Sequence, residues 1–315
     1  MAKDHSVTQH AGSDGQFRRQ ESTFRSTIAP GTEHPPEKGR YILYVALICP
    51  WACRTLHVRA LKQLEDIIDV AVLDWQLTEK GWTFNRRTKE ATGDPVLGKQ
   101  LIREIYHHDD PDYSLRYTVP VLFDKKTEKI VNNESSEIIR ILYTAFDELL
   151  PDGSPAKGKT YLPAEHAAEI DELNGWIYDK INNGVYKTGF ATKQEVYEAH
   201  VQNVFDGLDR VESILSDGRQ YLVPGAGLSE ADIRIYPTLI RFDAAYYVLF
   251  KCNIRSIRDG YPHIHRYLRN LYWNYPAFSD WTNFEHIKKC IQGYSSAGAA
   301  NGIVPHGPVP SILPL

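Results

Sequence analysis

The feature that most restricts the fold of this chain is a Cys-Pro pair that joins an apolar run to a helix. The apolar run, Arg40–Leu47, is typical of a buried strand. Pro50 suits the first position of a helix, where a backbone N–H is not needed. Cys49 is therefore predicted to be the N-cap of that helix. Because the helix dipole and the N–H groups there stabilise a thiolate, the sequence predicts a reactive thiol at Cys49.

The alternative for Cys49 is a small packing residue, which is the commoner role of an isolated cysteine. Its place between a strand and a proline-started helix favours thiol chemistry. Cys53 lies one turn further on, at i+4, whereas a dithiol motif needs a cysteine at i+3, where this chain has Ala52. We therefore expect chemistry with one cysteine and an external thiol. Cys252 and Cys290 are far away in sequence and are expected to be structural.

Length and composition indicate a folded two-domain protein. A chain of 315 residues exceeds the size at which one core usually divides. A hydrophobic fraction of 42% is ordinary for globular proteins, and a net charge of -4 argues against general nucleic-acid binding. No secretory signal or membrane-spanning run is visible, so neither secretion nor a membrane partner is expected. Four cysteines without a close framework fit a reducing compartment, and a cytoplasmic location is expected.

Changes of composition divide the chain into five segments. They are an N-terminal arm at 1–39, an α/β domain at 40–147, a linker at 148–162, an all-α domain at 163–290 and a C-terminal extension at 291–315. The arm is polar and is expected to be partly disordered or wrapped over the surface. Proline and glycine mark the linker.

Strand and helix patterns alternate before the linker, and helical patterns follow it. The expected strands are Ile67–Leu73, Thr118–Asp124 and Lys129–Val131, in addition to the apolar run before Cys49. Helices are expected from Pro50 to about Leu64 and from Glu134 onward, with a loop-rich stretch from Trp75 to about Pro111. After the linker, helices are expected at Ala164–Ile181, Lys193–Leu215 and Ser229–Leu249. This order predicts a small α/β layer followed by a helical domain.

The motifs together resemble a glutathione transferase. The general ones are Cys-Pro-Trp-Ala-Cys-Arg, the Thr-Val-Pro-Val-Leu strand and the Glu-Ser helix start. More specific motifs resemble the xi class, the glutathionyl-hydroquinone reductases; they are Gly81–Phe84, Asn182–Lys187, Arg241–Tyr246, Phe250–Asn253 and Gly302–Pro305. The resemblance covers about residues 22–310. It implies a thioredoxin-like α/β domain followed by an all-α domain, the glutathione transferase fold, and a homodimer.

The resemblance also implies a set of glutathione-binding residues. They are Trp82, Arg116, Val119, Pro120, Glu134 and Ser135. A cis-proline bend would expose the backbone of Val119 to a peptide ligand, and a helix N-terminus suits the γ-glutamyl carboxylate. Each residue also has a plainer role open to it: an edge-strand proline, a helix cap for Glu134 and Ser135, a surface Arg116 and a core Trp82.

Tyr186 and Tyr246 are the catalytic tyrosines that the resemblance implies, holding the hydroxyls of a hydroquinone. A phenol can bind such a hydroxyl and deliver a proton, although most tyrosines only pack. The xi class usually has a third tyrosine near the C-terminus, in a His-Tyr pair. Here Cys290-Ile291 replaces that pair, and Tyr294 is the nearby residue that could bind the quinol instead.

The implied enzyme reduces glutathionyl-hydroquinones to hydroquinones. A mixed disulfide between Cys49 and glutathione forms and is released as oxidised glutathione. Glutathione is the expected co-substrate, and no metal is expected. Two alternatives remain open: an omega-like thioltransferase or dehydroascorbate reductase, and a non-catalytic carrier of aromatic ligands.

Overall fold

The chain forms two compact units. The computed structural model describes residues 11–78, 80–293 and 303–315, and all their side chains except those of residues 290–293. Residues 20–160 form the first unit, and the described residues from Tyr161 onward form the second, together with arm residues 11–19. The arm therefore contributes to both units. Among the described residues, no helix is both long enough and apolar enough to span a bilayer.

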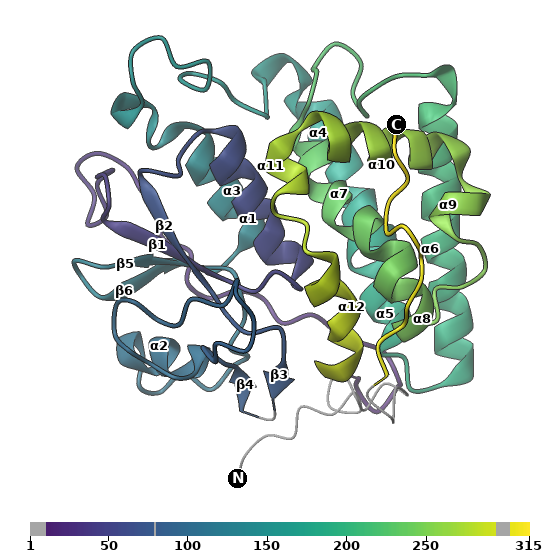
Figure 1. Cartoon of the computed structure of the whole chain (residues 1–315), viewed down its shortest axis with the longest axis horizontal. Helices are drawn as coiled ribbons and strands as arrows, with labels where there is room; N and C mark the ends of the chain where they lie inside the picture. Colours follow the sequence, from purple (N-terminus) through teal and green to yellow (C-terminus); the bar gives the residue numbers. More distant parts are fainter. Residues whose placement is uncertain (1–10, 79, 294–302) are drawn as a thin grey trace. The chain divides into compact units, whose positions relative to one another are not determined.

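The first unit is built on a four-stranded sheet with the strand order β2-β1-β5-β6 (Figure 1). The strands are β1 (Tyr41–Val45), β2 (Ile68–Val72), β5 (Val121–Asp124) and β6 (Lys129–Asn132). Strand β1 pairs in parallel with β2 and antiparallel with β5, and β5 pairs antiparallel with β6. Every residue of β1 is fully buried. The predicted buried strand is confirmed.

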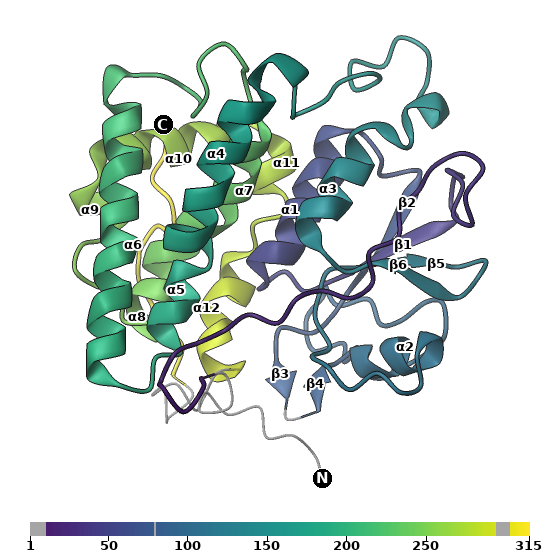
Figure 2. The same cartoon turned by 180° about the vertical axis from the view of Figure 1, so that it is seen from behind.

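Helices cover both faces of this sheet. Helix α1 (Pro50–Leu61) packs against α3 (Ser135–Thr144) on one face, and α2 (Ile102–Asp109) lies on the opposite face (Figures 1 and 2). Helix α3 buries one side, made of Ile138, Ile139 and Leu142. The predicted thioredoxin-like arrangement of the first unit is confirmed.

The prediction of a loop-rich stretch from Trp75 to about Pro111 is wrong in two places. A short hairpin joins β3 (Leu77–Thr78) to β4 (Gly81–Trp82), and α2 follows it. Helix α2 has only eight residues, and its buried side is Ile102, Ile105 and Tyr106. That spacing is helical, but over two turns among many polar residues and glycines it is too short a signal to outweigh its surroundings.

The second unit is helical (Figure 2). Its longer helices are α4 (Ala167–Ile177), α5 (Gly184–Gly189), α6 (Gln194–Ile214), α7 (Glu230–Arg241), α10 (Pro262–Asn274) and α12 (Phe284–Gly293). The short ones are α8 (Tyr247–Leu249), α9 (Ile257–Gly260) and α11 (Pro276–Ser279). Single π-helical turns at Tyr178–Asn182 and Phe242–Tyr246 continue α4 and α7. The three helices predicted after the linker are confirmed, with these π turns as the local difference.

A buried lysine fixes the start of the linker to the first unit. Lys62 follows the last turn of α1 and is fully buried. Its Nζ donates to Asp147 Oδ1 at 2.8 Å, to the Ala156 carbonyl at 2.6 Å and to the Lys159 carbonyl at 2.7 Å. An ammonium group has three protons, so these contacts use its full donor capacity.

We expect Lys62→Met to lower the free energy of unfolding by about 2–4 kcal/mol, because it removes a charged donor from a carboxylate and two carbonyls. Chemical denaturation measures the change. Lys89→Met is the matched control, since the Lys89 side chain is 91% exposed. A loss that is equally small in both variants would contradict the role assigned to Lys62.

A second buried ionic group, formed by Asp124, Arg40 and His34, connects the arm to the sheet. Asp124, at the end of β5, is fully buried; its Oδ1 accepts from Arg40 Nε at 2.9 Å, and its Oδ2 lies 2.9 Å from His34 Nδ1. Burial alone would raise the pKa of Asp124. The hydrogen bonds from Arg40 and His34 outweigh burial and hold the pKa well below its ordinary value.

We expect this group to make the protein less stable in acid. A carboxyl whose pKa is depressed by folding stabilises the folded state above its unfolded pKa of about 3.9, and that contribution is lost as the pH falls toward the folded pKa. Thermal melting between pH 6 and 2 should show the loss, and Asp124→Asn should flatten it. Asp112→Asn, at an exposed position, is the control. If Asp124→Asn lost as much thermal stability between pH 6 and 2 as the wild type, Asp124 would not be the cause of the acid sensitivity.

Candidate functional site

Cys49 is the N-cap of α1, as the sequence predicts. Its backbone is extended, with φ -79° and ψ 118°, and Pro50 opens the helix. The Cys49 carbonyl accepts from the Cys53 N–H at 3.1 Å, which is the first bond of the helix. Cys49 is half-buried, whereas Cys53 and Cys252 are fully buried. Burial also raises the pKa of Cys252, so among these three cysteines Cys49 is the best placed for thiol chemistry.

The Cys49 thiol lies against the backbone of Val119. Its Sγ is 3.5 Å from the Val119 carbonyl oxygen and donates to it. The Val119-Pro120 peptide bond is cis, as the resemblance implies. The Tyr106 hydroxyl donates to the Thr118 carbonyl at 2.9 Å and holds the chain just before this bend. The structure thus brings together the predicted nucleophile and the predicted peptide-binding backbone.

Glu134 caps helix α3, which is the plainer of the two roles predicted for it. Its Oε1 accepts from the Ser136 N–H at 3.1 Å, and its Oε2 lies 3.2 Å from the Ser22 hydroxyl. Ser135 is the first residue of α3 and is 3% exposed. Capping fixes Glu134 and Ser135 at a positive helix end, which is also what an anion-binding role requires.

Trp82 and Arg116 are held by contacts of their own in the first unit. Trp82 lies in β4, paired with Leu77, and is 7% exposed. The Arg116 carbonyl accepts from the Tyr113 hydroxyl at 3.1 Å, and its N–H donates to Gln20 Oε1 at 3.2 Å. These contacts fix the backbone of both residues, and the roles of their side chains toward a ligand stay predictions.

The N-terminal arm contacts two of these residues, Arg116 and Glu134, which the sequence of the arm does not indicate. Gln20 bonds to Arg116, and Ser22 bonds to the cap residue Glu134. Between them and Ile28 the arm runs beside β6, where Arg25 bridges to Asn132 and the Ser26 N–H donates to the Val131 carbonyl at 2.9 Å. A polar segment without periodicity carries no sequence signal for such contacts.

The second unit brings Tyr186 and Tyr246 together across 60 residues of sequence. Their hydroxyl oxygens are 3.4 Å apart, and the two residues are 8% and 4% exposed. Tyr186 lies in α5, and Tyr246 ends the π turn after α7. π turns occur frequently at functional sites, and both tyrosines lie at or shortly after one.

Three phenylalanines complete an aromatic cluster around the two tyrosines, defined as Phe17, Tyr186, Phe190, Tyr246 and Phe250. The Phe250 ring centroid is 5.3 Å from that of Tyr186 and 5.4 Å from that of Tyr246. Phe17, from the arm, is 5.2 Å from Phe190. These contacts restrict the rings of both tyrosines. Tyr294, the third predicted quinol-binding tyrosine, lies outside the described residues.

Gly189 makes this packing possible, because a Cβ on it would lie 2.2 Å from Cγ of Phe250. We expect Gly189→Ala to displace the Phe250 ring and to lower the free energy of unfolding by about 1–3 kcal/mol through overpacking. Gly175→Ala is the matched control, since Gly175 also lies in a helix and its Cβ would meet nothing within 4 Å. Denaturation of both variants is the measurement. A Gly189→Ala variant as stable as the wild type would contradict this packing.

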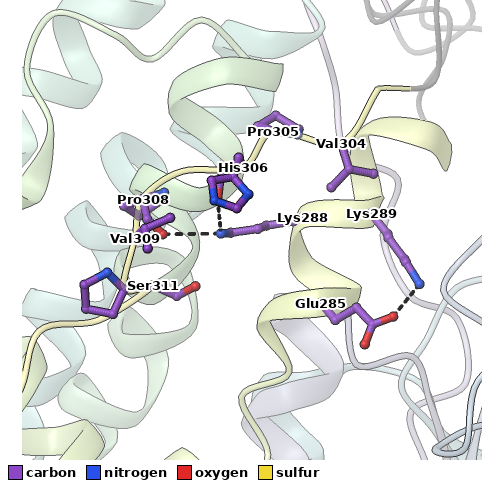
Figure 3. A pocket seen from close by; sticks show the side chains of 10 residues that line it. Glu285, Lys288, Lys289, Val304, Pro305, His306, Pro308, Val309 and Ser311 are labelled. Carbon is purple, nitrogen blue, oxygen red and sulfur yellow. Dashed lines mark hydrogen bonds and ion pairs between the residues drawn. The ribbon is translucent and has the colours of Figure 1, made fainter.

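A separate cavity of about 450 Å³ lies in the second unit between α12 and the C-terminal segment (Figure 3). Lys288 points across it and donates to the His306 carbonyl at 2.7 Å. Burial and the nearby Arg258 lower the pKa of Lys288. The lining residues include no predicted site residue that the structure describes.

The described residues contain no group of three or more His, Cys, Asp or Glu side chains able to hold a metal ion.

A thioredoxin-like unit with a helix-capping cysteine, followed by a helical unit, defines the general class of this protein. Family models agree with that class. The model "Glutathione S-transferase, N-terminal domain" matches residues 48–145, and "Glutathione S-transferase, C-terminal domain" matches residues 194–270.

Relatives narrow the class. "Glutathionyl-hydroquinone reductase YqjG" of Escherichia coli is 45% identical over 93% of this chain and 89% of its own length. "Glutathione S-transferase omega-like 2" of Schizosaccharomyces pombe is 46% identical over 99% of both chains. The crystal structure of the Xi glutathione transferase ECM4 from Saccharomyces cerevisiae in complex with glutathione is 46% identical, with a TM-score of 0.91 over 95% of this chain and 99% of that one. The chain therefore belongs to the glutathione S-transferase family and, within it, to the xi class.

Proposed function

We propose that this protein reduces glutathionyl-hydroquinones to hydroquinones, with glutathione as co-substrate. The observation that carries the proposal is the pair of phenol hydroxyls of Tyr186 and Tyr246, 3.4 Å apart in the aromatic cluster. Such a pair suits a ligand that presents a ring and a hydroxyl. The name of the Escherichia coli relative supports this substrate class.

Glutathione is proposed to bind along the cis-proline bend. The backbone of Val119 would pair with the cysteine of glutathione, and the N-terminus of α3 at Glu134 and Ser135 would bind the γ-glutamyl group. Trp82 and Arg116 are proposed to complete this site. Since Cys49 Sγ is 3.5 Å from the Val119 carbonyl, a peptide held there would bring its sulfur close to the thiol. The glutathione complex of the yeast xi-class structure supports glutathione as the ligand.

In the first step the Cys49 thiolate attacks the sulfur that joins glutathione to the hydroquinone ring. An S–S bond forms between Cys49 and glutathione, and the bond between that sulfur and the ring carbon breaks. The electron pair stays on the ring carbon, which takes a proton and leaves as part of the hydroquinone. Tyr186 and Tyr246 orient the ring through its hydroxyls and deliver the proton.

In the second step another glutathione thiolate attacks the mixed disulfide. Oxidised glutathione leaves and the Cys49 thiolate is restored. Overall, one glutathionyl-hydroquinone and one glutathione give one hydroquinone and one oxidised glutathione. A serine or tyrosine in place of Cys49 could not form the disulfide, so the cysteine favours reduction over conjugation.

A second candidate function is omega-like thioltransferase or dehydroascorbate reductase activity. The same accessible Cys49 would serve it, and the name of the Schizosaccharomyces pombe relative favours it. A third candidate is a non-catalytic carrier of aromatic ligands, which would use the aromatic cluster alone. We also propose a homodimer, on the resemblance to the xi class; light scattering of the purified protein would measure its mass. A cytoplasmic location is proposed from the four cysteines without a close framework.

Steady-state assays with three substrates separate these candidates. They are a glutathionylated hydroquinone, the mixed disulfide of glutathione with 2-mercaptoethanol, and dehydroascorbate. The proposal requires turnover of the hydroquinone adduct with release of free hydroquinone. Turnover of only the other two would favour an omega-like enzyme, and no turnover of any would refute both enzymatic candidates.

Cys49→Ser should lower kcat/KM for the hydroquinone adduct about a thousandfold or more, because the nucleophile that forms the mixed disulfide is lost. Cys53→Ser is the matched control one turn further along α1, and it should keep most of the activity. Mass spectrometry of the wild type treated with the adduct should show one bound glutathione on Cys49. Full activity in Cys49→Ser would refute the mechanism.

A further inference from the structure

The N-terminal arm places a guanidinium group on the ring of Tyr186. The Cζ atom of Arg19 lies 4.9 Å from the centre of that ring and 5.4 Å from the centre of the Phe17 ring. Its Nε donates to Asn183 Oδ1 at 2.9 Å. Because Asn183 is the N-cap of α5, which carries Tyr186, the same helix holds the guanidinium and presents the ring to it.

The arm around Arg19 is packed against the second unit. Phe17 is 4% exposed and belongs to the aromatic cluster. The Gly15 carbonyl accepts from the Thr192 N–H at 3.2 Å. Gly15 has a φ of +85° and lies against the Lys193 side chain, where a Cβ would approach within 2.8 Å. The position of Arg19 is thus fixed by the packing of the arm residues before it as well as by its contacts with α5.

A cation over the face of a phenol changes what the phenol can do. The positive charge attracts the electron density of the ring, so the hydroxyl becomes a stronger hydrogen-bond donor. A planar guanidinium also stacks on the ring and limits its rotation, which a lysine ammonium cannot do to the same extent. Both effects act on Tyr186, the residue proposed to hold and protonate the quinol.

We propose that Arg19 is a positioning residue for Tyr186 in the reduction of glutathionyl-hydroquinones. This inference rests on the proposed function. Arg19 acts through the orientation and donor strength of the Tyr186 hydroxyl, so its loss should affect the aromatic substrate selectively. The exchange of Cys49 with a substrate that has no ring does not use Tyr186 and should not depend on Arg19.

The test compares Arg19→Met with Arg18→Met on two substrates. Arg18 is the matched control: it is the neighbouring arginine, its side chain is 67% exposed, and it pairs with Asp14. The substrates are the glutathionylated hydroquinone and the mixed disulfide of glutathione with 2-mercaptoethanol. We expect Arg19→Met to lower kcat for the hydroquinone adduct about tenfold, with KM changed less than twofold and the mixed disulfide turned over as by wild type. Arg19→Lys should recover part of kcat, and Arg18→Met should match wild type.

Unchanged activity on the mixed disulfide also shows that Arg19→Met is folded. An equal loss on both substrates would mean a structural role and would overturn the inference. The inference would also be overturned if Arg19→Met had the same kcat for the hydroquinone adduct as Arg18→Met. That result would leave the proposed function intact. If the wild type failed to turn over the hydroquinone adduct, the proposed function would fail, and the role of Arg19 in it would fall with it.

Discussion

The junction between β1 and α1 is the constraint on which the first unit depends. Strand β1 is buried along its whole length between β2 and β5, so its direction is fixed by pairing on both sides. A four-residue turn at 46–49 joins β1 to α1: the Cys49 N–H donates to the Ala46 carbonyl at 2.9 Å, and Pro50 opens the helix. Cys49 is consequently held at the helix N-terminus with its thiol toward Val119. The position of Cys49 therefore follows from the pairing of β1 together with this short turn.

Local signals made the first unit largely predictable. Three signals that act within a few residues located its elements correctly. They are the apolar run of β1, the proline at the start of α1 and the Glu-Ser start of α3. Helix α2 was missed, because three apolar residues over two turns do not stand out among glycines and charges. In the second unit the period located the helices that contain α4, α6 and α7, whereas α10 and α12 were not predicted.

The site was predictable only in part, for a physical reason. Nothing local marks Tyr186 and Tyr246 among 19 tyrosines, since their meeting depends on how α5 and the turn after α7 pack. The resemblance to the xi class supplied them. The contacts of Arg19, Gln20 and Ser22 were not found by either route, because they join a segment without pattern to residues about 100 or more positions away.

The course of the arm beside β6 has a consequence for solubility. Strand β6 is the last strand of its sheet, and such strands can pair with other chains and start aggregation. The bonds from Ser26 to Val131 and from Asn133 to Phe24 occupy backbone groups at that margin. Detachment of the arm would therefore expose the unpaired edge of β6. It would also remove the contacts of the arm with Arg116, Glu134 and Tyr186. One segment thus both covers the edge of β6 and contacts Arg116, Glu134 and Tyr186.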